Sequence, residues 1–242
     1  MTEMLLLAAI LIPCLIVAIV FHEVAHGWTA LALGDPTAKE QRRLSLNPIR
    51  HVDPVGTLLV PGALALFGGP IFGWAKPVPV RGDRLRDPRF GMVAVAAAGP
   101  GSNLLIALVA AIILGLSLPV GGELAGSSIG LPIVINSGGE LAIVSTSMLF
   151  LILINAFLAL FNLLPIPPFD GSHIVGGLLP REWAGNWQKL QSLGMLFFIV
   201  LIAATWAFPD SGLIENTVLP PVLGLQERYF AIAEWIARGI AG

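Results

Sequence analysis

Charged residues are scarce in this chain, and cysteine is almost absent. Only 12% of the 242 residues are charged whereas 56% are hydrophobic, a balance too apolar for an ordinary soluble domain. The formal net charge of -2 provides no basic field for nucleic acid, so nucleic-acid binding is excluded. The single cysteine, Cys14, can form no intramolecular disulfide and is expected to pack as a small hydrophobic side chain. The composition predicts an integral membrane protein in a lipid bilayer.

Long apolar runs account for most of the sequence. Residues 5–33 are apolar apart from His22, Glu23, His26 and a few small polar residues, and they can cross a hydrocarbon core of about 30 Å. The leader before this run has no Lys or Arg and no small-residue cleavage site follows, so we expect a retained helix instead of a signal peptide. Further crossings are predicted over residues 90–120, 141–164 and 190–208.

Two basic loops flank residues 54–75 and set the predicted topology. Residues 34–53 and 81–89 each carry four basic residues. A full crossing between them would place these loops on opposite sides of the membrane, which the positive-inside rule opposes. Because the apolar run within residues 54–75 is short and broken by prolines and glycines, it predicts a re-entrant hairpin or loop. Both basic loops are then cytoplasmic.

The remaining segments complete a predicted all-α membrane fold of about four transmembrane helices. Residues 121–140 are rich in Gly and Ser and lack basic residues, which favours a non-cytoplasmic loop. Residues 226–240 have amphipathic helical spacing, which favours a C-terminal interfacial helix. No internal repeat and no appended soluble domain is visible, so we expect a single membrane-embedded domain over residues 1–242.

The strongest chemical signal lies in the first apolar run, where residues 21–27 read FHEVAHG. His22 and His26 are one helical turn apart and can both reach a tetrahedral Zn²⁺, and Glu23 beside them can act as general base. The alternative is a polar patch that arose by chance. Ionisable side chains in an apolar helix cost a few kcal/mol unless they are paired or ligating, which favours a metal site.

A catalytic zinc needs a third protein ligand. The sequence NLLPIPPFDG at residues 162–171 contains three prolines, which forbid a regular helix and predict a loop at membrane depth. Asp170 in this loop is the best candidate. It could instead cap a helix, since Gly171 and Ser172 follow, and the residues alone leave these readings near even. His51 and His173 are the other candidates.

Three motifs together resemble the site-2 protease family of intramembrane zinc metalloproteases. These are HEVAH, GPGSN at residues 99–103 and NLLPIPPFDG, in the family's order. The resemblance implies that His22, His26 and Asp170 coordinate Zn²⁺ while Glu23 activates water to cleave a membrane-embedded segment of a substrate, with a catalytic core of about residues 5–177. Phe169 replaces the more usual Leu before Asp170. The resemblance also implies a membrane hairpin with a strand edge for the substrate, for which residues 57–60 and 78–80 are candidates.

Asn103 and Asn162 match the asparagines of the second and third motifs. Each could bond a substrate backbone or support the site, and each could instead join helices within the membrane. His51 is expected to make loop hydrogen bonds, and His173, one turn beyond Asp170, could support the metal ligands.

The sequence therefore predicts a multi-pass zinc endopeptidase of a bacterial-type inner or plasma membrane. Its site would lie near the cytoplasmic face, and its substrate would be a single-pass or small membrane protein. A catalytically silent metal-binding scaffold of the same fold is the alternative, which the intact Glu23 opposes. A metal transporter would need ionisable residues on several crossings, and the second and fourth lack them.

Overall fold

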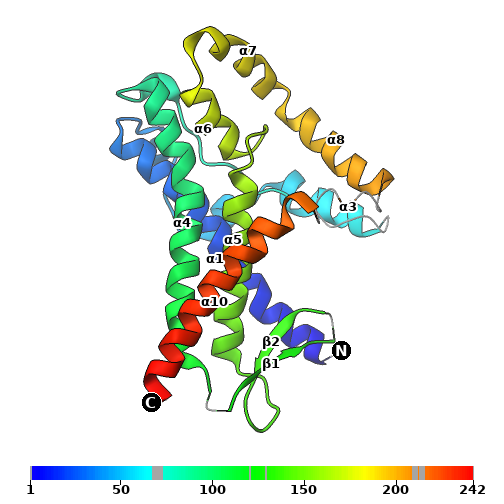
Figure 1. Ribbon diagram of the computed structural model, residues 1–242. Coiled ribbons are helices and arrows are strands. Elements are labelled where there is room, and N and C mark those ends of the chain that lie inside the picture. Colours follow the sequence, from blue (N-terminus) through cyan, green and yellow to red (C-terminus); the bar gives the residue numbers. More distant parts are fainter. Residues whose placement is uncertain are drawn as a thin grey trace. The chain divides into compact units, whose positions relative to one another are not determined.

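The computed structural model forms two compact units, which are described one at a time. The first unit comprises residues 1–18, 103–159 and 220–242, and the second comprises residues 19–102 and 160–219. The residues described are 2–66, 73–119, 121–128, 130–208, 212 and 216–241. Three long helices contribute residues to both units: α1 (Thr2–Ala32), α4 (Pro88–Ser117) and α5 (Ile143–Asn162) (Figure 1).

These three helices are the ones, among the described residues, that are long and apolar enough to cross a membrane. The candidate spans are Glu3–Ala32, Pro88–Ser117 and Ile143–Asn162. They match the first three predicted crossings, and the shortest, with 20 residues, is about 30 Å long. The prediction of a mostly helical membrane protein is confirmed.

The predicted fourth crossing, residues 190–208, is divided at Leu193. Before it lies α7 (Arg181–Ser192), and after it lies α8 (Gly194–Ala207). With 14 residues, α8 is about 21 Å long, which is shorter than a hydrocarbon core of about 30 Å. The described residues thus provide three helices of spanning length where the sequence predicted about four.

The predicted re-entrant segment begins as helix. Asp53 caps a short π-helix, η2 (Pro54–Leu59), by accepting bonds from Val55 N at 3.0 Å and Gly56 N at 2.8 Å, and α3 (Val60–Leu66) follows. Residues 67–72 of this segment lie outside the described residues. The expectation of a strand edge at residues 57–60 is wrong, because the Asp-Pro start nucleates a helix there.

In the first unit, α10 (Leu219–Ala241) packs along α4 and α5 (Figure 1). Tyr229 Oη donates to the Leu104 carbonyl at 2.9 Å, and Gln226 Nε2 donates to the Leu153 carbonyl at 3.2 Å. Ala233 is buried in the same apolar cluster as residues of α4 and α5. The predicted C-terminal helix is present within α10, with its inner face on these helices; an interfacial position stays a prediction.

A small hairpin stands where the sequence predicted a loop. Strands β1 (Glu123–Gly126) and β2 (Pro132–Ile135) pair antiparallel with Glu123 opposite Ile135. Val134 is buried, and its amide donates to Thr146 Oγ1 of α5 at 3.0 Å. The β-branched residues of β2 therefore cover the beginning of α5.

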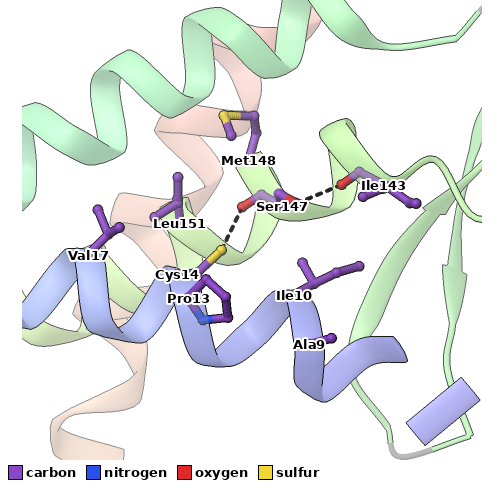
Figure 2. Close-up of a pocket in the computed structure, with 9 residues that line it drawn as sticks. All are labelled: Ala9, Ile10, Pro13, Cys14, Val17, Ile143, Ser147, Met148 and Leu151. Carbon is purple, nitrogen blue, oxygen red and sulfur yellow. Dashed lines mark hydrogen bonds between the residues drawn. The ribbon is translucent and has the colours of Figure 1, made fainter. Parts of the chain in front are cut away.

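Helices α1 and α5 flank a mostly apolar groove of about 300 Å³ in the first unit (Figure 2). Cys14 lines it, and the Cys14 thiol donates to the Ser147 carbonyl at 3.5 Å. Cys14 is 6% exposed, which confirms its prediction as a buried, small apolar side chain.

The second unit begins where α1 carries its polar residues. Helix α1 ends in a Schellman motif, in which Asp35 N bonds Ala30 O at 2.9 Å and Gly34 N bonds Leu31 O at 3.1 Å. Gly34 has a φ of 110°, which suits glycine. The short helices α2 (Thr37–Glu40), η1 (Pro48–His51) and η3 (Gly82–Arg84) follow. At the other end of the unit, α6 (Asp170–Leu178) is joined to α4 by a bond of 2.6 Å from Arg89 Nε to the Gly177 carbonyl.

Candidate functional site

His22 and His26 project from the same face of α1, as their spacing predicts. The two Nε2 atoms are 3.1 Å apart, and the ring centroids are 4.7 Å apart in an edge-to-face arrangement. Both side chains are nearly buried. Their nitrogen atoms therefore point at one common position in the protein interior.

Asp170, at the start of α6, completes a three-residue cluster. Its Oδ2 lies 3.2 Å from His22 Nε2 and 3.4 Å from His26 Nε2. Within the part of the chain that the structure describes, these residues form the one group of three or more potential metal ligands. The structure thus brings together the three residues that the sequence singled out.

The spacing of these atoms fits a tetrahedral metal ion. Bonds of about 2.0–2.1 Å in tetrahedral geometry separate two ligands by about 3.4 Å. The three observed separations are 3.1, 3.2 and 3.4 Å. Asp170 Oδ2 is buried and makes no well-aligned hydrogen bond to protein. A buried carboxylate oxygen without such a bond is costly, and a cation among the three atoms would satisfy it.

Glycines make room for this cluster. A Cβ on Gly99, in α4, would collide with His26 Nε2 and would lie 2.6 Å from His22 Cε1. A Cβ on Gly171 would collide with the carbonyl oxygens of Leu163 and Leu164. These two close approaches explain a glycine in GPGSN and the glycine after Asp170.

The Val95 carbonyl fixes the tautomer of His26. His26 Nδ1 lies 2.7 Å from this oxygen, so Nδ1 carries the hydrogen and donates it. In the neutral ring the lone pair is then on Nε2, the atom that faces His22 and Asp170. Such a bond to the remote nitrogen orients a histidine for metal binding.

Asp170 carries its negative charge at the N-terminus of a helix. The N-cap of α6 is Phe169, and Asp170 is the first helical residue, so Asp170 is not in the cap position that its alternative reading required. Burial raises the pKa of Asp170, but the two nearby imidazoles outweigh burial and bring the pKa to about 2. The helix dipole also favours an anion there. A carboxylate in the ionised form is suited to metal binding.

Glu23 leaves the same helix but has a different partner. Its Oε2 accepts a hydrogen bond of 2.8 Å from the amide of Val78, in the extended residues that precede η3. This bond fixes one carboxylate oxygen of the predicted general base.

Asn103 lies in the first unit and is fully buried. Its Nδ2 donates to the Ala18 carbonyl at 3.2 Å and to Asn155 Oδ1 at 2.7 Å. These bonds join α1, α4 and α5. They fit the second role considered for Asn103, that of joining helices within the membrane. Asn162 ends α5 before the loop that leads to Asp170, and it is partly buried.

The two remaining histidines lie outside the three-residue cluster. His51 is buried in η1, where its Nε2 donates to the Ser45 carbonyl at 2.7 Å. His173 lies on α6 with its Nδ1 3.3 Å from Gln191 Nε2. Burial lowers the pKa of His173, which favours the neutral ring.

Three groups at or near these residues were not anticipated from the sequence: the Val95 carbonyl, the Val78 amide and Asn155. The first two are backbone groups, which every residue has, so no residue type marks them. Asn155 is a polar residue in an apolar helix and could have been found by that signal.

Comparison with known proteins assigns the chain to a family. The model of peptidase family M50 matches residues 10–204. YwhC of Bacillus subtilis, which is named as a zinc metalloprotease, is 40% identical over 192 residues, or 79% of this chain and 78% of YwhC. Rip2 of Mycolicibacterium smegmatis, named likewise, is 25% identical over 188 residues, or 77% of this chain and 64% of Rip2.

Among solved structures, the site-2 protease from Methanocaldococcus jannaschii aligns with a TM-score of 0.40 at 17% identity, covering 95% of this chain and 78% of that one. The family match spans most of the chain, and the YwhC alignment covers more than three quarters of both proteins. The chain therefore belongs to peptidase family M50, which confirms the resemblance to site-2 proteases that its three motifs carry.

Proposed function

We propose that this protein is an intramembrane zinc endopeptidase that cleaves peptide bonds within or next to transmembrane segments of other membrane proteins. The observation that carries the proposal is the triangle of His22 Nε2, His26 Nε2 and Asp170 Oδ2, with sides of 3.1, 3.2 and 3.4 Å. Relatives named as zinc metalloproteases support zinc as the metal.

His22, His26 and Asp170 would hold the ion and leave a position for a water molecule. A zinc ion there would supply Lewis acidity and lower the pKa of that water toward about 7. Asp170 contributes a full negative charge, and the two neutral imidazoles contribute none. The Val95 carbonyl keeps His26 in the tautomer that this arrangement needs.

Glu23 is the proposed general base. Its carboxylate takes the proton of the attacking water and passes it to the nitrogen of the departing peptide. With Oε2 fixed by the Val78 amide, Oε1 remains to carry this proton. The substrate must be unwound at the cleaved bond, because a helix hides its carbonyl groups in its own hydrogen bonds.

The two asparagines are proposed as support residues with different tasks. Asn162 precedes the loop that carries Asp170, and its role would be to support that loop or bond the substrate backbone. Asn103 would act through the bonds that hold α1 against α4 and α5.

The membrane placement is also part of the proposal. The basic loops on either side of residues 54–75 favour a site near the cytoplasmic face of a bacterial-type inner or plasma membrane. The proposed architecture is a single domain with a C-terminal interfacial helix and a fourth crossing within residues 190–208, in which the last turn of α7 must add to the length of about 21 Å that α8 provides. The substrate would be a single-pass or small membrane protein.

Co-expression with a panel of single-pass membrane proteins tests this function. Wild type is expected to cleave at least one member, and Glu23→Gln none, because the base is lost while the metal ligands remain. Glu227→Gln is the matched control, since Glu227 is exposed on α10 and should not affect cleavage. Equal cleavage by Glu23→Gln would contradict the proposal. A zinc-loaded wild type that cleaves nothing would favour the silent scaffold.

A further inference from the structure

In residues 74–81, which precede η3, three alternate amides bond to groups of η2, η1 and α1. Trp74 N donates to the Gly56 carbonyl at 3.0 Å, and Lys76 N donates to the His51 carbonyl at 2.8 Å. Val78 N, the next in this alternation, donates to Glu23 Oε2 at 2.8 Å. Since alternate amides of an extended chain point to one side, this edge is committed to the protein itself. The acceptor of the Val78 amide, Glu23, is the proposed general base.

Two further features of this segment favour contact with α1 over pairing with another strand. Gly27, one helical turn after Glu23, allows the close approach, because a Cβ there would lie 2.8 Å from Val78 Cγ1 and 2.5 Å from Leu44 Cδ2. Pro77 and Pro79 have no N–H, so the opposite edge lacks donors at these two positions. An incoming strand would find no regular ladder there. The segment is thus better suited to holding Glu23 than to capturing a substrate by strand addition.

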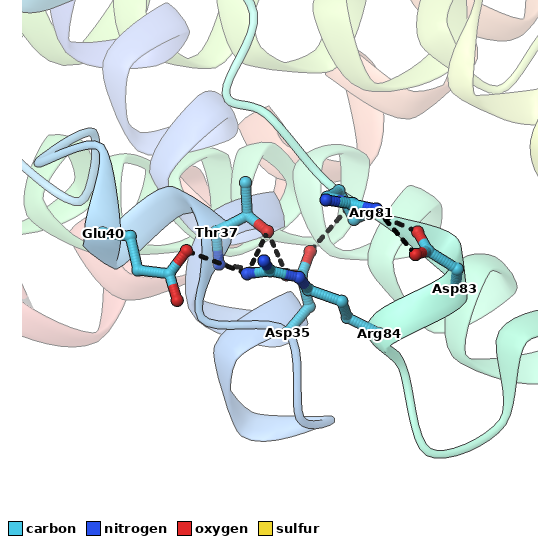
Figure 3. Close-up of polar contacts among 6 residues, drawn as sticks. All are labelled: Asp35, Thr37, Glu40, Arg81, Asp83 and Arg84. Atoms are coloured by element: carbon cyan, nitrogen blue, oxygen red, sulfur yellow. Dashed lines mark hydrogen bonds and ion pairs between the residues drawn. The ribbon is translucent and has the colours of Figure 1, made fainter.

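Asp35 fixes the far end of the same segment (Figure 3). It lies just past α1, in the Schellman motif, and is fully buried. One oxygen accepts from Arg81 N at 2.6 Å, and the other accepts from Thr37 N at 3.0 Å and from the Thr37 hydroxyl. Helix α1 and the turn that ends it therefore bond the segment at two amides three residues apart, with Glu23 accepting from Val78 and Asp35 accepting from Arg81.

We propose that residues 74–81 position the Glu23 carboxylate and that Asp35 is a positioning residue acting through the Val78 amide. The proposal rests on Glu23 being the general base. Without the bond from Arg81 N to Asp35, the segment would no longer be held beside α1. Glu23 would then lose the Val78 amide, the donor that sets the orientation of its carboxylate. Proton transfer would slow, whereas the metal ligands and the substrate site would remain.

Two pairs of variants test this. Asp35→Asn places an amide N–H where an acceptor is needed, either at Arg81 N or at Thr37 N. Its control is Asp83→Asn, on the same loop, where Asp83 is exposed and bonds the Arg81 side chain. Val78→Pro removes the donor to Glu23 and leaves Asp35 unchanged. Its control is Ile143→Pro, which exchanges another β-branched residue for proline at the exposed first position of α5, where proline is tolerated.

Each purified full-length protein is assayed for zinc content and for kcat and KM on a reporter that wild type cleaves. Because a general base contributes about 10²–10⁴-fold, we expect Asp35→Asn and Val78→Pro to lower kcat by about tenfold or more. KM should stay within about twofold and zinc should be retained; the controls should match wild type. Hydrogen exchange, which needs no substrate, should accelerate for peptides covering residues 76–82 in Asp35→Asn but not for α10.

The outcomes separate this proposal from the proposed function. If both variants keep the wild-type kcat while Glu23→Gln is inactive, the positioning role is wrong and the general base stands. A rise in KM at constant kcat would also overturn it, since the segment would then serve substrate binding. Unchanged exchange in residues 76–82 would do the same. If Asp35→Asn does not fold, the comparison of Val78→Pro with Ile143→Pro decides.

Discussion

Gly99 shows how closely α4 approaches the paired histidines. Its missing side chain leaves room for both imidazoles, and a methyl group there would meet the two rings. We therefore expect Gly99→Ala to turn the histidines away from Asp170 and to weaken zinc binding by about 10–100-fold, as changes next to metal ligands commonly do. Competition with a zinc chelator measures this.

Gly101→Ala is the control for Gly99→Ala. Gly101 lies on the same helix, and a Cβ there would meet nothing within 4 Å. In a helix interior this exchange is neutral or stabilises by about 1 kcal/mol. Equal zinc affinity in the two variants would show that Gly99 has no role at the histidines.

The three ligand candidates could be named from the sequence because their side chains are rare in such an apolar chain. His22 and His26 are two of four histidines, and their spacing predicts a common face. The residues alone left Asp170 near even between ligand and cap; the structure places Phe169 at the cap and Asp170 Oδ2 beside both imidazoles. The groups that orient the site, the Val95 carbonyl and the Val78 amide, could not be predicted from residue types.

At the scale of elements, the junction of α1 with residues 74–81 should depend on pH. Burial raises the pKa of Asp35, but hydrogen bonds from Arg81 N and Thr37 outweigh burial, so the pKa lies below its usual value. A lowered pKa in the folded state means that the Asp35 carboxylate stabilises the fold above the unfolded value of about 3.9. This stability is lost as pH falls through the lower, folded pKa.

Asp35→Asn should therefore be less stable than wild type by about 1–3 kcal/mol near neutral pH. The difference should shrink below about pH 4, because the unfolded wild-type chain takes up the proton first and the folded Asp35 carboxylate takes it up only at lower pH. Denaturant unfolding in detergent from pH 3 to 7 measures it, with the exposed Asp83→Asn as reference. A difference that stays constant over this range would contradict the role given to the Asp35 charge.

Helices and strands could be predicted where the length of an apolar run determines them, and less well where tertiary contacts determine them. The three long helices follow from their apolar runs. The hairpin of β1 and β2 was missed because a short segment rich in Gly and Ser reads as a loop, whereas Val134 is held by Thr146 of α5. No proline or glycine stands immediately before the break at Leu193, and only Gly194 follows it directly, so the sequence predicted one continuous helix there.

For the whole molecule, the topology follows from whether residues 54–75 turn back. If they do, Leu46 and Asp83 lie on the same side of the membrane, together with the basic loops. Single cysteines at these two positions, in a Cys14→Ala background, should react with a membrane-impermeant reagent from the same side of sealed vesicles. Labelling from opposite sides would mean that the segment crosses and that the active site is not placed as proposed.

The claim that His22, His26 and Asp170 hold zinc while Glu23 does not is tested most directly by the zinc content of two purified variants. The exchange of Asp for Asn keeps the shape of the side chain but removes its negative charge, so Asp170→Asn should lose most of its zinc. Glu23→Gln and wild type should each keep about one zinc ion per chain, because the three ligands together form one tetrahedral metal site. A zinc-replete Asp170→Asn protein would contradict the account and move the third ligand to another residue, with His173 and His51 the next to be replaced.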